Sequence, residues 1–205
     1  MKKKVYAFDF DGTLTTKDTL LEFIRYACGK RRLWMGLLLF SPLLVLMKLH
    51  LYPNWKVKQL FFAHYFRGMD IERFDDLCRR FAIDNNHLLR KNGIAVIRKA
   101  VSESSQVIIV SASIENWVRP FFLQFGNEVQ VACTKIDVRH ERLTGKFLTK
   151  NCYGQEKVKR IDRAFPHRKT YELIAFGDSK GDKKMLEYAD RSYYKPFRAV
   201  SEVYV

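Results

Sequence analysis

Cysteine is scarce in this sequence, and its placement argues against a cysteine zinc site and against a disulfide framework. Cys28, Cys78, Cys133 and Cys152 are scattered along 205 residues. No pair has the spacing of zinc ligands, and the set does not resemble the disulfide framework of a small secreted domain. Met1 to Lys4 resembles the start of a signal peptide, but the apolar run before Asp9 is too short for one. We therefore expect reduced thiols and a cytoplasmic location, with attachment at the inner membrane face as an option.

Acidic residues are also few relative to basic ones. The chain has 37 lysines and arginines against 22 acids, a formal charge of +15. Such a charge favours an anionic partner, which could be a phosphate ester, a lipid surface or a nucleic acid, although a merely solvated basic surface is the simpler alternative. No nucleic-acid-binding motif is recognisable, and the aromatic side chains resemble helix core rather than stacking platforms, so nucleic acid is the least favoured of the three.

Internal repeats and low-complexity linkers are absent, and three short apolar runs stand out instead. The first is Val5 to Phe8, followed by Asp9, Phe10 and Asp11; the others are residues 106–110 and 171–176. Helical patterns cover 94–101, 117–125 and 156–165. Alternation of this kind predicts an α/β fold with a doubly wound parallel sheet of the Rossmann type. Ligands bind such sheets at the carboxyl ends of the strands.

Roughly 90 residues separate the first two strands, too many for a simple crossover. Their mainly helical patterns predict an inserted helical cap over 16–92. The catalytic core would then comprise 1–15 and 93–205. Within the core, 134–150 contains two short apolar runs around a glycine turn, which predicts a small β hairpin.

Asp9 and Asp11 carry the strongest chemical signal. Carboxylates two residues apart on an extended strand point the same way, and they repel each other unless a cation or a shared proton intervenes. A divalent metal with oxygen ligands would relieve that repulsion. The ordinary alternative is an Asp-rich turn after a strand.

Polar residues at the other strand ends and at one helix start add weaker signals, each with an ordinary alternative. Ser111 suits a phosphate oxygen but also suits a helix N-cap. Lys157 could neutralise a phosphate, although an isolated lysine is usually on the surface. Asp178 and Asp182 suit a metal site, although Asp178 could simply cap a helix.

In combination, DxDGT, a strand ending in Ser, a lysine at a helix start and GDSxxD resemble the haloacid dehalogenase superfamily. The position of the cap resembles the phosphoserine-phosphatase-like branch, and Leu143 to Phe147 resembles members grouped with phosphatidylglycerophosphatase C. The resemblance implies that Asp9 is the nucleophile and Asp11 the general acid and base. It also implies a phosphate site formed by Thr13, Ser111, Ala112 and Lys157.

The same resemblance implies a Mg²⁺ ion held by Asp9, Asp11 and Asp178, with Asp182 behind them, and assigns substrate specificity to Asp18. We therefore expect a Mg²⁺-dependent phosphomonoesterase that acts through an aspartyl-phosphate. Its expected substrate is a lipid or lipid-like phosphate such as phosphatidylglycerophosphate. A phosphatase for phosphoserine or another small metabolite is the alternative.

The uncharged run from Leu33 to Met47 bears on that choice. Basic residues flank it, at 30–32 and at Lys48. The run is shorter than the ~20 residues that span a bilayer, and Pro42 is expected to kink or break a helix. Three interpretations stay open: a helix pair in the cap core, a segment in the membrane interface, and a true span.

Overall fold

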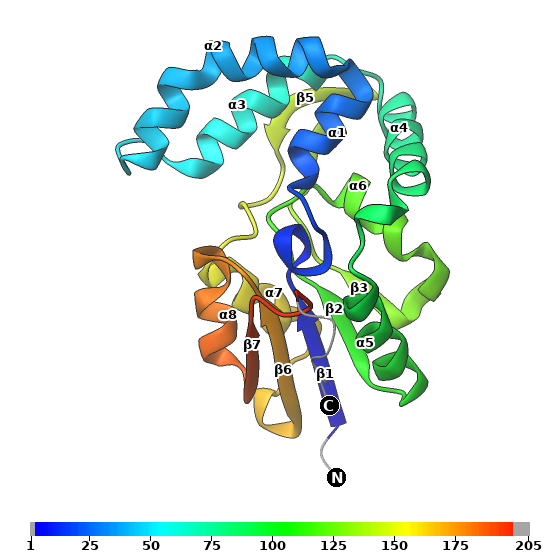
Figure 1. Cartoon of the computed structure of the whole chain (residues 1–205). Coiled ribbons are helices and arrows are strands. Elements are labelled where there is room, and N and C mark those ends of the chain that lie inside the picture. Colours follow the sequence, from blue (N-terminus) through cyan, green and yellow to red (C-terminus); the bar gives the residue numbers. More distant parts are fainter. Residues whose placement is uncertain (1–2, 199–205) are drawn as a thin grey trace.

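The computed structural model describes residues 3–198, and these contain a five-stranded parallel sheet (Figure 1). The strand order is β3-β2-β1-β6-β7, with bounds β1 Lys3–Phe8, β2 Gln106–Ile109, β3 Val129–Val131, β6 Tyr171–Gly177 and β7 Arg191–Tyr194. In the central strand, Phe8 is in register with Ile109 on one side and Phe176 on the other. The residues that follow these three strands therefore meet at one edge of the sheet.

Alternate residues of β1 enter two different hydrophobic clusters. Tyr6 and Phe8 pack in the cluster that includes α5 (Lys91–Ser102), whereas Val5 and Ala7 pack in the one that includes α7 (Gln155–Ala164) and α8 (Lys183–Tyr188). Strands that are buried on both faces carry continuous apolar runs, as this sequence does. The doubly wound α/β fold is confirmed.

One expected helix differs from the prediction. Residues 117–125 belong partly to α6 (Glu115–Val118) and mostly to the 3-10 segment η3 (Arg119–Glu128). Pro120 lacks the backbone N–H that a regular helix needs, and Gly126 has a φ of 54°. Two further 3-10 turns, η4 (Arg168–Thr170) and η5 (Lys180–Asp182), flank β6.

A helical insertion follows the turn η1 (Phe10–Leu14) and extends above the sheet edge (Figure 1). Its chain enters and leaves through adjacent segments: the Thr16 N–H donates to the Leu88 carbonyl at 2.9 Å, and the Arg90 N–H to the Leu14 carbonyl at 2.7 Å. Its elements are α1 (Thr19–Cys28), α2 (Lys30–Lys48), α3 (Asn54–Phe66), α4 (Ile71–Asp84) and η2 (Asn86–Leu88).

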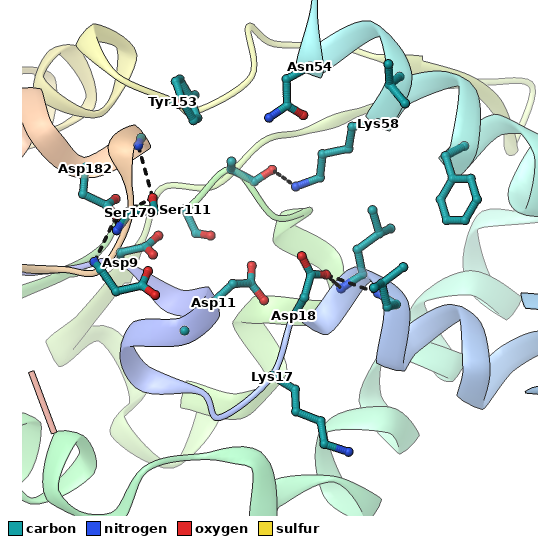
Figure 2. Close-up of a pocket in the computed structure, with 18 of the residues that line it drawn as sticks. Asp9, Asp11, Lys17, Asp18, Asn54, Lys58, Ser111, Tyr153, Ser179 and Asp182 are labelled. Carbon is teal, nitrogen blue, oxygen red and sulfur yellow. Dashed lines mark hydrogen bonds between the residues drawn. The ribbon is translucent and has the colours of Figure 1, made fainter. Parts of the chain in front are cut away.

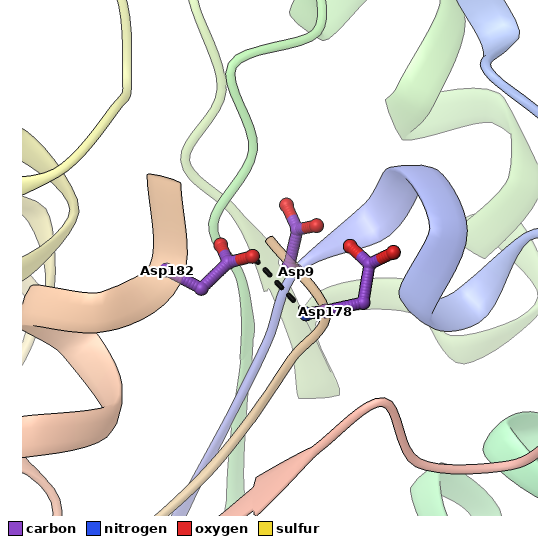
Figure 3. Close-up of side chains that lie close together, drawn as sticks. All are labelled: Asp9, Asp178 and Asp182. Atoms are coloured by element: carbon purple, nitrogen blue, oxygen red, sulfur yellow. Dashed lines mark hydrogen bonds between the residues drawn. The ribbon is translucent and has the colours of Figure 1, made fainter. Parts of the chain in front are cut away.

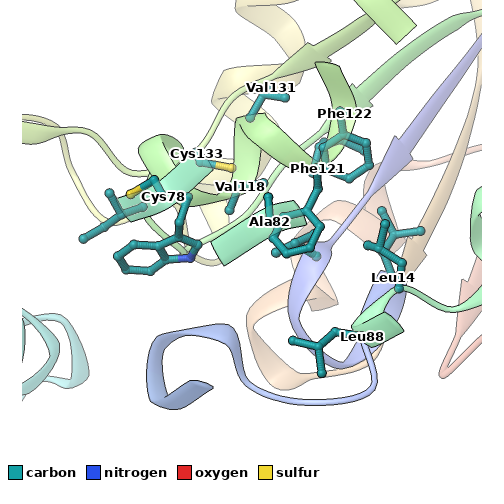
Figure 4. Packing of buried hydrophobic residues seen from close by; sticks show 14 of the residues in the cluster. Leu14, Cys78, Ala82, Leu88, Val118, Phe121, Phe122, Val131 and Cys133 are labelled. Carbon is teal, nitrogen blue, oxygen red and sulfur yellow. The ribbon is translucent and has the colours of Figure 1, made fainter. Parts of the chain in front are cut away.

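The insertion shares a hydrophobic core with the sheet domain. The Phe23 ring of α1 stacks on Trp117 of α6, with centroids 5.0 Å apart. Figure 4 shows Cys78 and Ala82 of α4 beside Val118 of α6 in the same cluster. This packing fixes the insertion over the carboxyl ends of the strands.

The uncharged run forms most of a single helix, α2, so Pro42 does not break it, and a kink at Pro42 stays a prediction. Proline cannot donate to the carbonyl four residues earlier, which here belongs to Leu38. The Ser41 hydroxyl donates to that carbonyl instead, at 2.8 Å, and replaces the lost bond. Among residues 3–198, no helix is both long and apolar enough to cross a membrane.

The expected hairpin is present as β4 (Ile136–Arg139) and β5 (Arg142–Phe147). It forms a separate antiparallel sheet that lies against the insertion: the Gly68 N–H donates to the Leu143 carbonyl at 2.8 Å. A Cβ at Gly145 would lie 2.7 Å from Cβ of Ala63 in α3, so glycine permits this close approach. The sequence predicts the hairpin within the core, whereas its packing partner is the helical insertion.

Candidate active site

Asp9 and Asp11 line one cavity of about 650 Å³ between the sheet edge and the insertion (Figure 2). Asp9 follows β1 directly, and Asp11 lies in the turn η1. Gly12 has a φ of 77°, which favours glycine. This turn lets both carboxylates face the cavity although the strand ends at Phe8.

Asp11 accepts hydrogen bonds from residues that do not contact Asp9. Its Oδ1 accepts from the Thr19 backbone N–H at 2.7 Å and from the Thr19 hydroxyl at 2.6 Å. Its Oδ2 accepts from the Ser113 hydroxyl. Thr19 begins α1 and Ser113 follows β2, so Asp11 connects the insertion to the sheet domain. Sequence reasoning assigned no role to these two donors.

Lys157 is the buried cation of the site. Only 2% of the residue is exposed, and its Nζ lies 2.5 Å from Asp9 Oδ1 and 2.6 Å from Asp182 Oδ1. Burial alone would lower the pKa of Lys157, but the two carboxylates raise it above its usual range. The alternative of an exposed surface lysine is therefore wrong.

The buried carboxylates differ in their pKa values. Burial raises the pKa of Asp9 to about 7, against the opposing effect of Lys157. For Asp182, burial also acts to raise the pKa, but Lys157 and the hydrogen bonds from Ser179 hold it below the ordinary value. The ionised form is therefore favoured at Asp182, whereas burial disfavours the ionised form of Asp9.

Asp178 joins these two acids at the end of β6. Carboxylate oxygens of Asp9, Asp178 and Asp182 all lie within 4.8 Å of one another (Figure 3). Asp182 Oδ2 accepts from the backbone N–H groups of Asp178 and Ser179 and from the Ser179 hydroxyl. Both Asp182 oxygens are therefore engaged by residues of the protein. Asp9 pairs with Lys157, and Asp178 Oδ2 pairs with Arg198 at 3.0 Å, and all three acids line the cavity.

The ordinary alternatives for Ser111 and Asp178 do not hold. The N-cap of α6 is Ile114, and the N-cap of η5 is Ser179. Ser111 instead accepts from the Ser113 N–H through its Oγ, and Ser111 and Ala112 both line the cavity. Thr13 does not line it: its side chain is buried, and its hydroxyl donates to Asp9 Oδ2 at 3.5 Å. The place of Thr13 in the phosphate site therefore stays a prediction.

Asp18 and Lys58 of the insertion line the same cavity (Figure 2). Asp18 caps α1, because its Oδ1 accepts from the N–H groups of Leu20 and Leu21. Burial and then the charge of Asp11 raise the pKa of Asp18. Lys58 of α3 donates to the Ala112 carbonyl at 2.9 Å. No local motif marks Lys58, which only tertiary packing brings to the site.

Comparisons with known proteins agree with this geometry. Residues 6–187 match the family model for haloacid dehalogenase-like hydrolases. Protein CicA of Caulobacter vibrioides is 31% identical over 195 residues, which cover 94% of this chain and 86% of that protein.

Two solved structures share the fold at 18% identity. A protein of unknown function from Bordetella pertussis has a TM-score of 0.77, covering 94% of this chain and 89% of that one. A substrate-bound phosphoserine phosphatase has a TM-score of 0.64, covering 95% and 86%. The carboxylates at the strand ends, the buried lysine and the family match lead to one conclusion: the chain belongs to the haloacid dehalogenase-like hydrolase family.

Proposed function

We propose that this hydrolase is a Mg²⁺-dependent phosphomonoesterase that forms an aspartyl-phosphate on Asp9. The observation that carries the proposal is that the two acids line one cavity but have different partners. Asp9 is buried against Lys157, whereas Asp11 accepts hydrogen bonds from Thr19 and Ser113. One carboxylate is thereby placed to attack and the other to transfer a proton.

In the first step, an Asp9 oxygen attacks phosphorus, and the bond from phosphorus to the substrate alkoxide breaks. Asp11, in its protonated form, gives its proton to the departing alkoxide. The Ser113 hydroxyl can rotate to accept from a protonated Asp11, since a hydroxyl both donates and accepts. In the second step, Asp11 takes a proton from water, which attacks phosphorus and releases phosphate from Asp9.

Lys157 stabilises the negative charge that spreads over the phosphoryl oxygens in both steps. Its Nζ already contacts the Asp9 oxygen. Asp182 fixes that ammonium group from the opposite side. Ser111 and Ala112 border the position of the phosphoryl group and offer it a hydroxyl and a backbone amide.

The donor set fits magnesium. Asp9 and Asp178 provide carboxylate oxygens, the ligand type that Mg²⁺ prefers, and the Asp11 carbonyl is the third proposed protein ligand. Asp182, with both oxygens engaged, supports the site from behind. A bound Mg²⁺ offsets the repulsion between the Asp9 carboxylate and the phosphate dianion.

The apolar part of the cavity supports a lipid or lipid-like substrate such as phosphatidylglycerophosphate. Leu37, Leu44 and Met47 of α2 line the same cavity as the catalytic acids, together with Val57 and Phe61 of α3. An apolar wall of this kind suits acyl chains better than a small zwitterion. A surface of anionic lipid as partner is consistent with the net charge of +15.

A small-metabolite phosphatase is the second candidate, and two residues favour it. Asp18 and Lys58 place opposite charges on the cavity wall, where they could hold the polar groups of a substrate such as phosphoserine. A comparison of kcat/KM for phosphatidylglycerophosphate, phosphoserine and sugar phosphates separates the two. A large preference for a soluble substrate refutes the lipid assignment.

The catalytic assignment is tested with p-nitrophenyl phosphate. We expect hydrolysis by the wild-type protein that depends on Mg²⁺, and none by Asp9→Asn, because an amide cannot form the covalent intermediate. Equal rates for the two proteins would refute the assignment of Asp9.

A further inference from the structure

The outer face of α2 exposes an unusual amount of apolar surface. Leu38 is 77% exposed, Leu39 64% and Trp34 60%. Leu49 and Leu51, just beyond the helix, are 60% and 71% exposed. Contiguous apolar exposure of this kind marks an interaction site rather than ordinary surface. The outer face of α2 is defined here as Trp34, Met35, Leu38, Leu39, Val45, Leu46, Leu49 and Leu51.

The inner face of helix α2 packs closely against α3, so the apolar outer face is not exposed because the helix is loosely packed. The Tyr65 hydroxyl of α3 donates to the Arg32 carbonyl at 3.0 Å, and a Cβ at Gly36 would clash with that hydroxyl. The Phe40 ring packs edge-on against Phe61. α2 and α3 lie together on the side of the insertion away from α4 (Figure 1).

The charge around this face has one sign. No acidic residue occurs between Glu22 and Asp70, whereas Lys30, Arg31 and Arg32 open α2 and Lys48 ends it. These four cations are exposed, and none has an ion pair among residues 3–198. A row of exposed apolar side chains between unpaired basic residues complements a layer that has an apolar interior and an anionic surface.

We propose that the outer face of α2 docks onto the surface of an anionic lipid bilayer, with the helix lying in the membrane plane. At 1.5 Å per residue its 19 residues extend over about 28 Å. The apolar side chains would enter the acyl region while the flanking cations contact headgroup phosphates. A second copy of this chain fits less well, because a twofold contact would bring like charges together.

The proposal deepens the proposed function, since it names the surface from which a lipid substrate would arrive. The inner face of α2 lines the cavity with Leu37, Leu44 and Met47, and the outer face meets the bilayer. A lipid could thus pass from the bilayer around α2 into the cavity. Its phosphate would then lie in the active site and its acyl chains against α2.

The test is flotation of the full-length protein with vesicles, and it does not require turnover. We expect wild-type protein to bind vesicles that contain phosphatidylglycerol and to bind pure phosphatidylcholine vesicles much more weakly. Leu38→Gln/Leu39→Gln should bind at least about tenfold more weakly, since two exposed leucines no longer enter the acyl region. Its hydrolysis of p-nitrophenyl phosphate should match wild type, which reports an intact fold.

The matched control is Ile83→Gln/Leu123→Gln. These side chains are 75% and 63% exposed but lie on α4 and η3. Their replacement should leave vesicle binding unchanged. No binding by wild type, or an equal loss in both double variants, overturns the proposal. So does a wild-type dimer that Leu38→Gln/Leu39→Gln converts to a monomer in light scattering.

The charge component has its own pair of variants. Arg31→Gln/Arg32→Gln should weaken binding to the anionic vesicles, whereas Arg98→Gln/Lys99→Gln on α5 should not, although both remove two exposed cations. Equal weakening by the two would mean a diffuse effect of net charge and would overturn the assigned face. If vesicle binding holds but p-nitrophenyl phosphate is not hydrolysed, the proposed function fails and the docking surface stands.

Discussion

Gly12 provides a sharp test of how the turn after β1 positions the metal ligands. The change is Gly12→Ala. The new Cβ would lie 2.3 Å from Asp178 Oδ2, far inside an ordinary contact, and the backbone φ of 77° disfavours any side chain. Both the turn and the carboxylate beside it are therefore affected.

Two effects of different size follow. A left-handed backbone costs an alanine about 1–2 kcal/mol, which lowers the free energy of unfolding. To reach 3.4 Å, where ordinary contact begins, Asp178 must also move by about 1.1 Å, the difference between 3.4 and 2.3 Å. A misplacement of about 1 Å at a catalytic group can reduce the rate by about 100-fold.

The matched control is Gly29→Ala, where φ is 87° and nothing lies within 4 Å of the new Cβ. Urea unfolding should show a loss of about 1–2 kcal/mol for Gly12→Ala. The loss should be about 1–3 kcal/mol for Gly29→Ala, because its ψ of 158° lies in a region that is essentially restricted to glycine. Only Gly12→Ala should also lose about 100-fold in kcat for p-nitrophenyl phosphate at saturating Mg²⁺. If Gly12→Ala keeps the activity of Gly29→Ala, the close approach of Asp178 to this turn has no catalytic importance.

Three further predictions concern single groups. Because burial raises the pKa of Asp9 to about 7 and the nucleophile must be anionic, kcat/KM at limiting Mg²⁺ should fall as the pH drops below about 7. Saturating Mg²⁺ favours the anionic form of Asp9, so the pH below which kcat/KM falls should shift to a lower value. A pH profile that is the same at limiting and saturating Mg²⁺ contradicts this prediction. Ser41→Ala leaves the Leu38 carbonyl without its donor and should cost about 0.5–1.5 kcal/mol in urea unfolding with no change in turnover; an unchanged stability means that water replaces the hydroxyl. Lys58→Met should raise KM for a substrate with an anionic group beyond the phosphate more than it raises KM for p-nitrophenyl phosphate; equal changes would exclude a role in substrate selection.

The chemistry of the site is largely local in the sequence, which is why it could be predicted. Asp9, Ser111 and Asp178 each follow a buried strand, and parallel strands bring such positions to one edge. The 3.6-residue periodicity likewise predicted α5 and α7. Such strand and helix periodicities can be predicted from the sequence because the geometry of the local backbone sets them.

Two of the failures have their physical origin in contacts between distant segments. Lys58 reaches the site only because α3 packs over it, and the hairpin lies against the insertion through contacts with Gly68 and Ala63. The helix does not break at Pro42, because one hydroxyl, on Ser41, replaces the missing donor. β3 and β7 contain polar residues, Gln130 in β3 and Arg191 and Ser192 in β7, so they lack the continuous apolar run that marked β2.

The most direct test of the account is to trap the covalent intermediate. The protein is mixed with a phosphomonoester and Mg²⁺, quenched in acid within a turnover, and digested for mass spectrometry. We predict one phosphoryl group on Asp9 in the wild-type protein and none in Asp9→Asn. Turnover without any phosphorylated aspartate, or a phosphoryl group on Asp11 instead, would contradict the central claim.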